Sequence, residues 1–190
     1  MKGPALVVGA SGGVGGALYD LLSKERRVVA VSSQARARSD WFETDYSEAS
    51  LNEIAGHLDS RFPLTFICGG FLHGDGIMPE KRLDDLSSSA LEMAFRKNTI
   101  APAMALKSFR PYFDQSQPAR CAVLSAKIGS IGDNRSGGWF SYRSSKAALN
   151  MIVKSAAIEL KRTHKELCLV ACLLYTSDAA DERSSVDLGG

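Results

Sequence analysis

The sequence predicts a doubly wound α/β domain built on a parallel sheet. Short apolar runs of strand length alternate with longer stretches in which apolar residues recur at helical spacing. A glycine-rich segment directly follows the first apolar run. This alternation implies helical crossovers that cover both faces of a parallel sheet, and 190 residues are enough for one such domain.

The individual elements follow from these periods in chain order. The predicted strands are "ALVV" (5–8), "VVAVS" (28–32), "WFET" (41–44), "LTFIC" (64–68), "CAVLS" (121–125) and "LCLVA" (167–171). Apolar residues at i, i+3 and i+4 predict helices over 14–24, 47–58, 87–113 and 140–163. No linker, repeat or low-complexity segment separates them, so we expect a single domain.

Composition and charge exclude several classes of protein. An apolar content of 45% and a charged content of 23% are typical of soluble globular proteins. The net charge is only +2 and the basic residues are scattered, so we expect no binding to nucleic acid or to a membrane. The first residues lack the pattern of a signal peptide, which favours a cytoplasmic protein.

The cysteines also favour a reducing compartment. None forms a CxxC pair, and no His or Asp stands beside them at ligand spacing, so we expect no metal site. Three lie in apolar, strand-like runs, which predicts buried, reduced thiols. The four are Cys68, Cys121, Cys168 and Cys172.

The segment "VVGASGGVGGAL" has the spacing of a dinucleotide-binding turn. Gly9 permits a tight turn after the strand, Gly13 lets backbone N–H groups approach a phosphate, and Gly15 lets the helix pack closely on the sheet. A pyrophosphate would then lie at the positive end of the helix. The alternative is a glycine-rich turn that binds nothing. The expected cofactor-binding residues here are Gly9, Ser11, Gly12, Gly13, Val14 and Gly15.

The second strand ends without the carboxylate that would bind the adenosine ribose hydroxyls and repel a 2′-phosphate. Ser32, Ser33 and Arg36 instead offer hydroxyls and positive charge, which favours NADP(H) while leaving NAD(H) possible. Arg38 is more simply a solvated loop residue. Asp45, after the third strand, could accept a hydrogen bond from the adenine amino group; alternatively, it or Ser47 could cap the next helix.

A third pattern, Tyr142-x-x-x-Lys146 in "FSYRSSKAALN", lies on a predicted helix. Residues four apart share a helix face, so the phenol and the ammonium lie together. A cation there stabilises phenolate and lets the tyrosine serve as a general acid/base. The alternative is an ordinary surface pair on an amphipathic helix.

Together with Asn98 in "FRKNTIAPA" and the strand "CAVLSA", these patterns resemble the short-chain dehydrogenase/reductase family over residues 1–171. Within it, "FLHGDGIMPEK", "GSIGDN" and "GGWFSYRSSKAALNM" are similar to the C-factor or sniffer type of carbonyl reductase. The resemblance implies a Rossmann-type sheet of order 3-2-1-4-5-6 and hydride transfer between a nicotinamide and a carbonyl or secondary alcohol. It also implies homodimers or tetramers assembled through 87–113 and 140–163.

The resemblance assigns roles to individual residues. Tyr142 would exchange the proton with the substrate oxygen, Lys146 would hold the nicotinamide ribose, and Asn98 would bind a water that relays protons to Lys146. Asn98 could instead only cap a break in the long helix. A dinucleotide-binding sensor or signalling protein with little turnover is the alternative function.

Two departures from the family pattern concern the site. The family's serine at the end of the fifth strand falls at Ala126, and the nearby Ser125 is our candidate for its role. The Asn-x-Ala-Gly after the fourth strand keeps only its glycines, Gly69 and Gly70, which are expected to contact the cofactor through their backbone.

The end of the sequence departs from the family altogether. Residues 172–190 lack the Pro-Gly turn, the nicotinamide-contacting Thr and the seventh strand, and resemble a translated sequencing adapter. We therefore expect 172–190 to be a non-native disordered tail and this chain to be weakly active. A genuine divergent terminus is the alternative.

Overall fold

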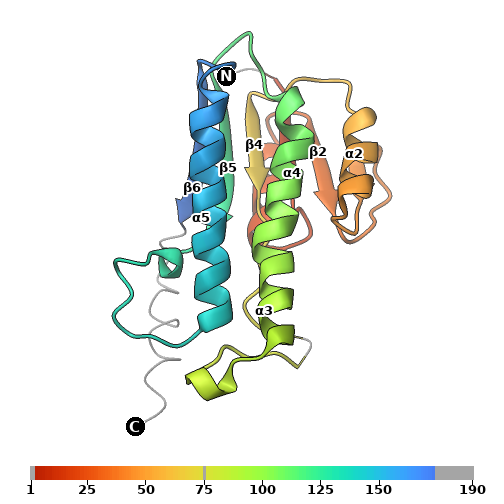
Figure 1. Cartoon of the computed structure of the whole chain (residues 1–190). Helices are drawn as coiled ribbons and strands as arrows, with labels where there is room; N and C mark the ends of the chain where they lie inside the picture. The colour runs from red at the N-terminus through yellow and green to blue at the C-terminus, as the bar shows by residue number, and fades with distance from the viewer. Residues whose placement is uncertain (1–2, 75, 174–190) are drawn as a thin grey trace.

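A computed structural model describes residues 3–74 and 76–173. It contains a six-stranded, entirely parallel sheet of order β3-β2-β1-β4-β5-β6, which confirms the predicted fold class. The strands are β1 (Ala5–Val8), β2 (Val28–Ser32), β3 (Trp41–Glu43), β4 (Leu64–Ile67), β5 (Ala119–Ser125) and β6 (Leu167–Leu173). All strand arrows point the same way, so their carboxyl ends meet at the lower edge of the sheet in Figure 1.

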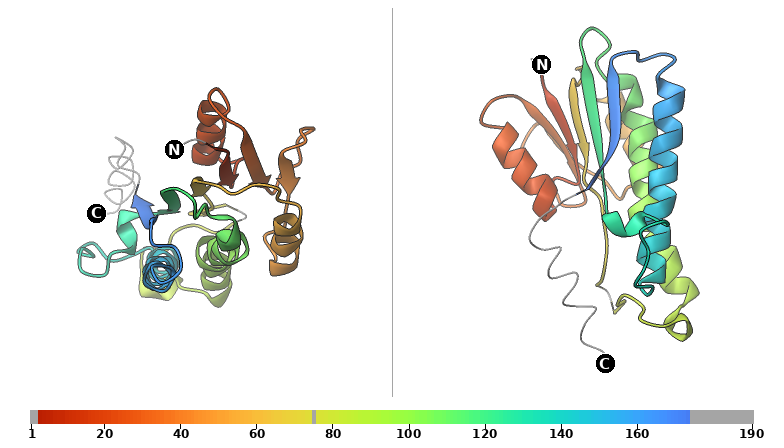
Figure 2. Two further views of the ribbon diagram at one scale, coloured as in Figure 1. Left: turned by 90° about the horizontal axis from the view of Figure 1, so that it is seen from above. Right: turned by 90° about the vertical axis from the view of Figure 1, so that its left-hand side faces the viewer.

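Helices cover both faces of this sheet. Helix α1 lies on one side, whereas α2, α4 and α5 lie on the other, as the right-hand view of Figure 2 shows for α1, α4 and α5. The bounds are α1 (Gly13–Leu22), α2 (Glu48–Gly56), α3 (Ser88–Phe95), α4 (Ala101–Phe109) and α5 (Phe140–Leu160). Each α-helix starts and ends within three residues of a predicted boundary, except inside the predicted helix 87–113.

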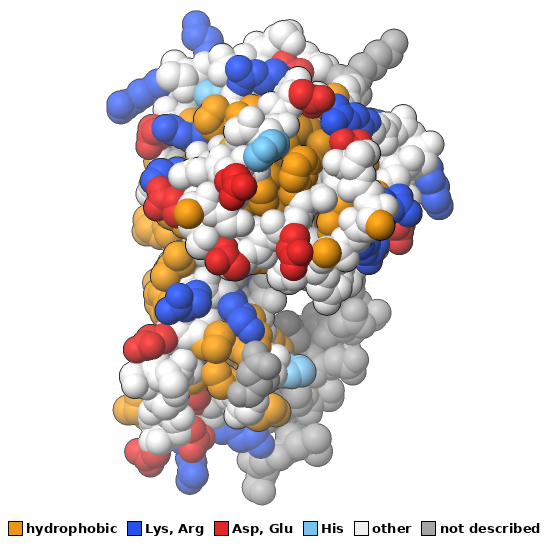
Figure 3. Space-filling view, turned by 90° about the vertical axis from the view of Figure 1, so that its right-hand side faces the viewer, with side chains coloured by type: hydrophobic (Ala, Val, Ile, Leu, Met, Phe, Trp, Pro, Cys, Tyr) orange, Lys and Arg blue, Asp and Glu red, His pale blue; other side chains and the backbone are white. Residues whose placement is uncertain are grey.

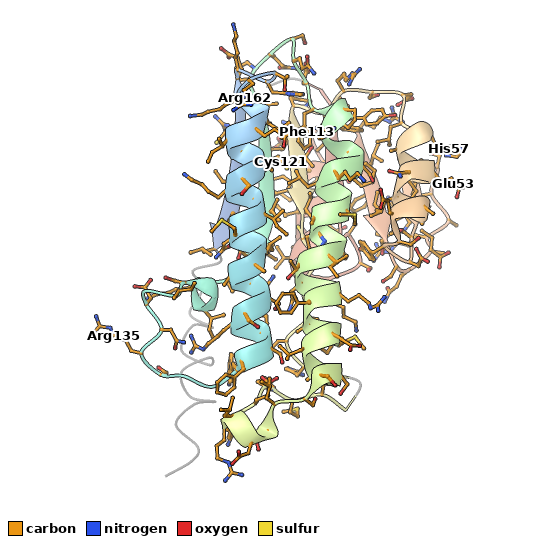
Figure 4. The ribbon with its side chains drawn as sticks, in the orientation of Figure 1. Glu53, His57, Phe113, Cys121, Arg135 and Arg162 are labelled. Carbon is orange, nitrogen blue, oxygen red and sulfur yellow. The ribbon has the colours of Figure 1, made fainter. Side chains whose placement is uncertain are left out.

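The sheet therefore has a core on each face. The α1 side is smaller, and its buried residues include Val7, Tyr19, Ala30 and Trp41. The other side is larger, and its buried residues include Leu6, Val29, Phe109, Val123 and Leu149. In Figure 4, Phe113 and Cys121 lie between the sheet and the helices α4 and α5, where both are buried. Alternate residues of the buried strands thus serve opposite faces, as parallel strands covered on both sides require.

The predicted helix 87–113 is interrupted. Helix α3 passes into a π-helical turn, η2 (Arg96–Ile100), before α4 begins, and a 3₁₀ turn, η3 (Arg110–Tyr112), ends it. Pro102 has no N–H to donate to the carbonyl of Asn98, so the regular α-helical ladder cannot continue through this turn. The break places Asn98 and Thr99 in the buried π-turn.

Strand β6 differs from its prediction in two ways. It continues to Leu173, past the expected end at Ala171, and pairs with β5 as far as Ser125. Its residues are also more exposed than expected: Cys168 is exposed and Val170 is 44% exposed. The expected non-native tail 172–190 therefore begins inside this strand, while residues 174–190 lie outside the described residues.

The cysteine prediction holds in part. Cys121 is buried and Cys68 is partly exposed. Cys168 is exposed and Cys172 is partly exposed, because both lie on β6, at the edge of the described sheet. All four are free thiols. Among residues 3–74 and 76–173, no three His, Cys, Asp or Glu side chains cluster as metal ligands. In the same residues, no helix is both long enough and apolar enough to span a membrane.

The charged side chains are mixed in sign on the visible surface. Figure 3 shows Lys and Arg interspersed with Asp and Glu on the side that carries α2. The structure also pairs opposite charges across elements, as in Arg27 with Asp40 (2.7 Å) and Asp59 (2.9 Å). Both pairs are exposed, so each contributes only about 0–1 kcal/mol to stability.

Candidate active site

In the turn after β1, backbone segments lie unusually close to one another. Gly9 has φ = +85°, and a Cβ there would lie 3.1 Å from the carbonyl carbon of Cys68. A Cβ on Gly15 would lie 2.1 Å from the carbonyl oxygen of Gly9, well inside any permitted contact. Both positions therefore require glycine, as the sequence pattern predicts, and the start of α1 packs directly on this turn.

The amino end of α1 is open. Its N-cap residue is Gly12, which has no side chain to cap the first turn. A Cβ on Gly13 would meet no atom within 4 Å, so the backbone there faces free space. The first N–H groups of a helix lack intrahelical partners and carry partial positive charge, which suits a phosphate. Ser11 and Val14 flank these glycines and are partly exposed.

The loop after β2 holds its residues in different ways. Ser32 is fully buried and its Oγ accepts a hydrogen bond from the Gln34 N–H at 3.0 Å, whereas Ser33 is exposed. The Arg36 guanidinium lies 4.4 Å from the centre of the Trp41 ring. Arg38 donates to the Tyr19 hydroxyl at 3.0 Å, so it is an exposed residue with a fixed contact rather than one in solvent alone.

Asp45 and Ser47 together begin α2. The Ser47 hydroxyl accepts from the Ser50 N–H at 3.2 Å, and the Asp45 carboxylate accepts from the Ser47 N–H at 2.8 Å. Hydrogen bonds from Ser47 hold the pKa of Asp45 below its usual value. Of the two expected caps, Ser47 is therefore the N-cap of α2, and Asp45 supports it from the preceding turn. The Asp45 carboxylate is exposed.

Tyr142 and Lys146 lie on the first turns of α5, as their spacing predicts. The Lys146 Nζ lies 6.0 Å from the centre of the Tyr142 ring, and Trp139 meets the same ring edge-on at 6.3 Å. The start of α5 is at the carboxyl edge of the sheet (Figure 1). In Figure 4 the preceding loop carries Arg135 away from the body of the molecule, so Arg135 is not part of this cluster.

Lys146 is an unusual buried cation. It is 2% exposed, and its Nζ donates to the Leu124 carbonyl at 3.2 Å. Burial lowers the pKa of Lys146 from 10.5 to about 8. At neutral pH the ammonium therefore remains the major form, and little free energy is needed to remove its proton.

Asn98 connects three segments inside the protein. It is fully buried, its Oδ1 accepts from the Phe71 N–H at 2.6 Å, and its Nδ2 donates to the Phe71 carbonyl at 2.8 Å and to the Ser145 Oγ at 3.1 Å. The sequence left open whether Asn98 binds a relay water or only caps a break in the long helix. In the structure it lies at that break, and its side chain also makes contacts outside the helix. The side chain joins the loop after β4 to α5, one residue before Lys146.

Gly70 lies between two groups of site residues. One is the glycine turn, Gly9–Gly15. The other, called the α5 cluster, is Tyr142 and Lys146 with the buried polar residues around them: Glu80, Asn98, Ser141 and Ser145. A Cβ at Gly70 would lie 3.5 Å from the Lys146 Nζ and 3.9 Å from the Asn98 Oδ1. Its neighbour Gly69 approaches Gly9, because a Cβ on Gly9 would lie 3.2 Å from the Gly69 N. The carboxyl ends of β1 and β4 thus join the two groups of predicted residues along one edge.

The serine candidate has a different environment. Ser125 is buried, and its Oγ donates to the Asn150 Oδ1 at 2.6 Å. The single hydroxyl proton of Ser125 is therefore used in the hydrogen bond to Asn150 on α5. Ser125 could donate to a substrate only after its hydroxyl rotates. The neighbouring Ala126 has no hydroxyl, and Ser130 accepts from the Asp133 N–H at 3.3 Å.

Sequence reasoning missed three polar residues that organise this site. Ser145 is fully buried and donates to the Tyr142 carbonyl at 2.9 Å, and its place before Lys146 could have indicated it. Glu80 and Ser141 form a buried hydrogen-bonded pair at the start of α5. They are 61 residues apart, and no local spacing links them.

Comparison with curated proteins finds partial relatives, although no family model matches the chain. The chain is 34% identical over 104 residues to 1-hydroxy-2-glutathionyl-2-methyl-3-butene dehydrogenase of Rhodococcus sp., covering 55% of this chain and 41% of the relative. It is 33% identical over 79 residues to C-signal of Myxococcus xanthus, covering 42% of this chain and 48% of the relative. These matches thus span less than half the length of each relative.

Solved structures share the fold of the described chain. A short-chain dehydrogenase/reductase from Burkholderia multivorans with bound NADP matches with a TM-score of 0.76 at 24% identity, covering 90% of this chain and 78% of that chain. The carbonyl reductase Sniffer of D. melanogaster matches with a TM-score of 0.74 at 22% identity, covering 90% and 79%. The resemblance predicted from the sequence is therefore confirmed, and the chain has the fold of the short-chain dehydrogenases and reductases.

Proposed function

We propose that this protein is an NADP(H)-dependent oxidoreductase that interconverts a carbonyl and a secondary alcohol. One observation carries the proposal: Tyr142 and the buried Lys146 lie together at the carboxyl edge of the sheet, where Gly70 connects them to the glycine turn. Among residues 3–74 and 76–173 no carboxylate pairs with Lys146, and a protein that needed the fold only for stability would gain nothing from burying such a lysine.

The residues present fit a dinucleotide. Gly9 and Gly15 form a turn that any Cβ would disrupt, and the uncapped start of α1 offers backbone N–H groups to a pyrophosphate. When bound, the nicotinamide supplies or accepts the hydride. Ser33 and Arg36 would contact the adenosine ribose and a 2′-phosphate, and Asp45 would contact the adenine, while Ser32 shapes the turn. The relative with bound NADP supports this preference over NAD(H).

Tyr142 is proposed as the proton donor. Its hydroxyl would donate a proton to the carbonyl oxygen during reduction, and its phenolate would accept the alcohol proton in the reverse direction. The proximity of the Lys146 ammonium would stabilise the phenolate left behind. Because Lys146 has a pKa of about 8, it could also replenish the tyrosine proton near neutral pH.

The surrounding residues would hold this pair in place. Lys146 would donate to the nicotinamide ribose, and Asn98 fixes the loop at Phe71 beside it. The side-chain amide of Asn98 already has protein partners, and Pro102 has no N–H to donate to its main-chain carbonyl, so this carbonyl would bind the relay water. Gly69 and Gly70 would contact the cofactor through their backbone. Ser125 would orient the substrate only after releasing Asn150.

A dinucleotide-binding sensor or signalling protein is the second candidate. The Ser125 hydroxyl donates to Asn150, and Ala126 supplies no hydroxyl, so neither of these two positions offers the substrate carbonyl a ready donor. The partial match to a protein named C-signal supports the same possibility. Such a protein would bind the dinucleotide and show little turnover.

One experiment separates the two candidates. NADPH binding to the purified chain is measured by calorimetry, and NADPH oxidation is followed with a panel of aldehydes and ketones. We expect binding together with slow, Tyr142-dependent turnover. Binding without turnover would favour the sensor, and the absence of binding would contradict both.

Cytoplasmic location and assembly into dimers or tetramers remain predictions. Three large apolar side chains on η2 and α5 support assembly, because Ile100, Met151 and Ile158 are 52%, 67% and 57% exposed. Measuring mass in solution, before and after Met151→Glu, tests whether α5 mediates the contact.

A further inference from the structure

A buried carboxylate lies at the start of the helix that carries Tyr142. Glu80, in the loop after β4, is only 4% exposed. Its Oε2 accepts from the Ser141 N–H at 3.2 Å, and its Oε1 accepts from the Ser141 Oγ. Both carboxylate oxygens therefore bind a single residue, the one that precedes Tyr142.

Helix α5 needs this contact because its own N-cap residue supplies none. Trp139 occupies the N-cap with φ = +52° and makes no side-chain cap hydrogen bond. Gly137 and Gly138 before it also have positive φ angles, +65° and +61°. The first N–H groups of a helix need acceptors, and a carboxylate is the favoured one at the positive end. Glu80 fills this role from 61 residues away.

Two further sets of contacts fix the residues around the helix start, one from the Glu80 loop and one from α5 itself. The Trp139 N–H donates to the Glu80 carbonyl oxygen. Arg143, one residue beyond Tyr142, donates through Nε to the carbonyls of Gly137 at 3.1 Å and Gly138 at 3.0 Å. The strained left-handed segment is therefore held by contacts at both of its ends.

Tyr142 is packed against this arrangement. Its ring meets Trp139 edge-on, and Tyr142, Ser141 and Glu80 line a common cavity with Phe71 and Ile77. The cavity volume is about 10 Å³, which is close to the space of one water and too small for a substrate. The contacts of Glu80 therefore bear on the position of the tyrosine rather than on substrate binding.

We propose that Glu80 is a positioning residue, which caps α5 from the loop after β4 and thereby sets the direction of the Tyr142 phenol. This inference rests on the proposed function of Tyr142. It assigns no direct contact with substrate or cofactor to Glu80. Loss of the carboxylate would let the first turn of α5 fray, and the phenol would no longer be aligned with Lys146.

Kinetics of the full chain form the first test. For Glu80→Ala we expect kcat to fall about tenfold to a hundredfold, because small misplacements of a catalytic group have effects of this size. The Kd for NADPH should stay unchanged, and the isotope effect with deuterated NADPH should rise as hydride transfer becomes limiting. Glu80→Gln keeps the side-chain length and one acceptor, so it should recover part of the rate. Glu92→Ala, an exposed glutamate on α3, is the control and should behave as wild type.

A spectroscopic test does not depend on turnover, so it separates failure of this inference from failure of the proposed function. In protein labelled with ¹³C at the tyrosine Cζ, the Tyr142 signal is identified by its loss in Tyr142→Phe. Glu80→Gln and Ser141→Ala should shift that signal, while the signals of Tyr19 and Tyr112 stay in place. These milder variants also serve if Glu80→Ala does not fold. The proposal is overturned if the Tyr142 signal does not move, or if Glu80→Ala and Glu92→Ala have the same kcat.

Discussion

The glycine turn and the α5 cluster are built in different ways. The glycine turn, at Gly9–Gly15, is made of backbone: Gly15 packs on the Gly9 carbonyl six residues earlier, and Gly9 lies against the backbone of Cys68 and Gly69. The α5 cluster is made of buried side chains whose partners are distant: Asn98 contacts residues 27 and 47 positions away, and Glu80 contacts Ser141 across 61. The glycine turn should thus be sensitive to an added Cβ. The α5 cluster should instead be sensitive to the loss of individual side-chain groups.

The largest expected effect is in the α5 cluster. Tyr142→Phe removes the proposed proton donor, so carbonyl reduction by the chain should fall about a hundredfold or more. NADPH affinity should stay within about twofold, because the glycine turn is untouched. Steady-state rates and calorimetry measure both quantities. Equal rates for Tyr142→Phe and wild type would show that Tyr142 is not the proton donor.

The second effect concerns the buried lysine and stability. The folded state lowers the pKa of Lys146 from 10.5 to about 8, so the unfolded chain binds more protons between these two pH values. The free energy of unfolding should therefore rise with pH across this window, by up to about 3 kcal/mol from this group alone.

Subtraction isolates this contribution from those of other groups. Burial raises the pKa of Cys68 to about 12 and of Tyr46 to about 12, and these shifts act with the opposite sign at high pH. Denaturant unfolding of wild type minus Lys146→Met should show the rise, whereas wild type minus Lys154→Met, an exposed lysine on the same helix, should not. A flat difference for Lys146→Met would mean that its ammonium is not desolvated.

A matched pair of glycines tests the turn. Gly15→Ala places a Cβ 2.1 Å from the Gly9 carbonyl oxygen, whereas Gly16→Ala places one 3.5 Å from the Ala10 carbonyl oxygen. Gly15→Ala should destabilise the fold by about 1–3 kcal/mol and abolish NADPH binding. Gly16→Ala should be neutral or stabilise by about 0.5–1 kcal/mol, since alanine favours a helix interior. Similar unfolding midpoints for the two variants would contradict the close packing of Gly15 on the Gly9 carbonyl.

The smallest effect concerns cofactor preference. Arg36→Gln should lower the ratio of NADPH to NADH affinity by about tenfold, the change expected for loss of one charge-assisted contact of about 1.5 kcal/mol. Arg38→Gln should change that ratio less, because the Arg38 guanidinium is bound to the Tyr19 hydroxyl. Competitive binding of the two dinucleotides measures the ratio. A larger change for Arg38→Gln than for Arg36→Gln would mean that Arg38, and not Arg36, contacts the 2′-phosphate.

Much of the fold could be predicted from the sequence because its signals are local. The apolar runs gave all six strands, and Gly9 and Gly15 lie where the spacing requires them. The π-turn at Arg96–Ile100 was not predicted, although Pro102 marks the position at which the helical ladder fails. The end of β6 was placed too early: the apolar run and the pairing with β5 both continue to Leu173, whereas the expected end followed the family resemblance, which stops at Ala171.

The site could be predicted only where spacing carries information. Tyr142 and Lys146 share a helix face, so four-residue spacing was sufficient to bring them together. Glu80, Ser141 and Ser145 gave no such signal, because their roles depend on how a loop meets a helix far along the chain. Ser125 was predicted from its neighbourhood in the sequence, and the partner of its hydroxyl, Asn150, lies on another element.

The central claim is that the glycine turn and the α5 cluster form one site. The most direct test is to add NADP⁺ to the chain labelled with ¹³C at the tyrosine Cζ and to follow the Tyr142 signal. We predict that this signal shifts as the dinucleotide saturates and that Gly15→Ala prevents the shift. Saturable binding of NADP⁺ that leaves the Tyr142 signal unmoved would contradict the account.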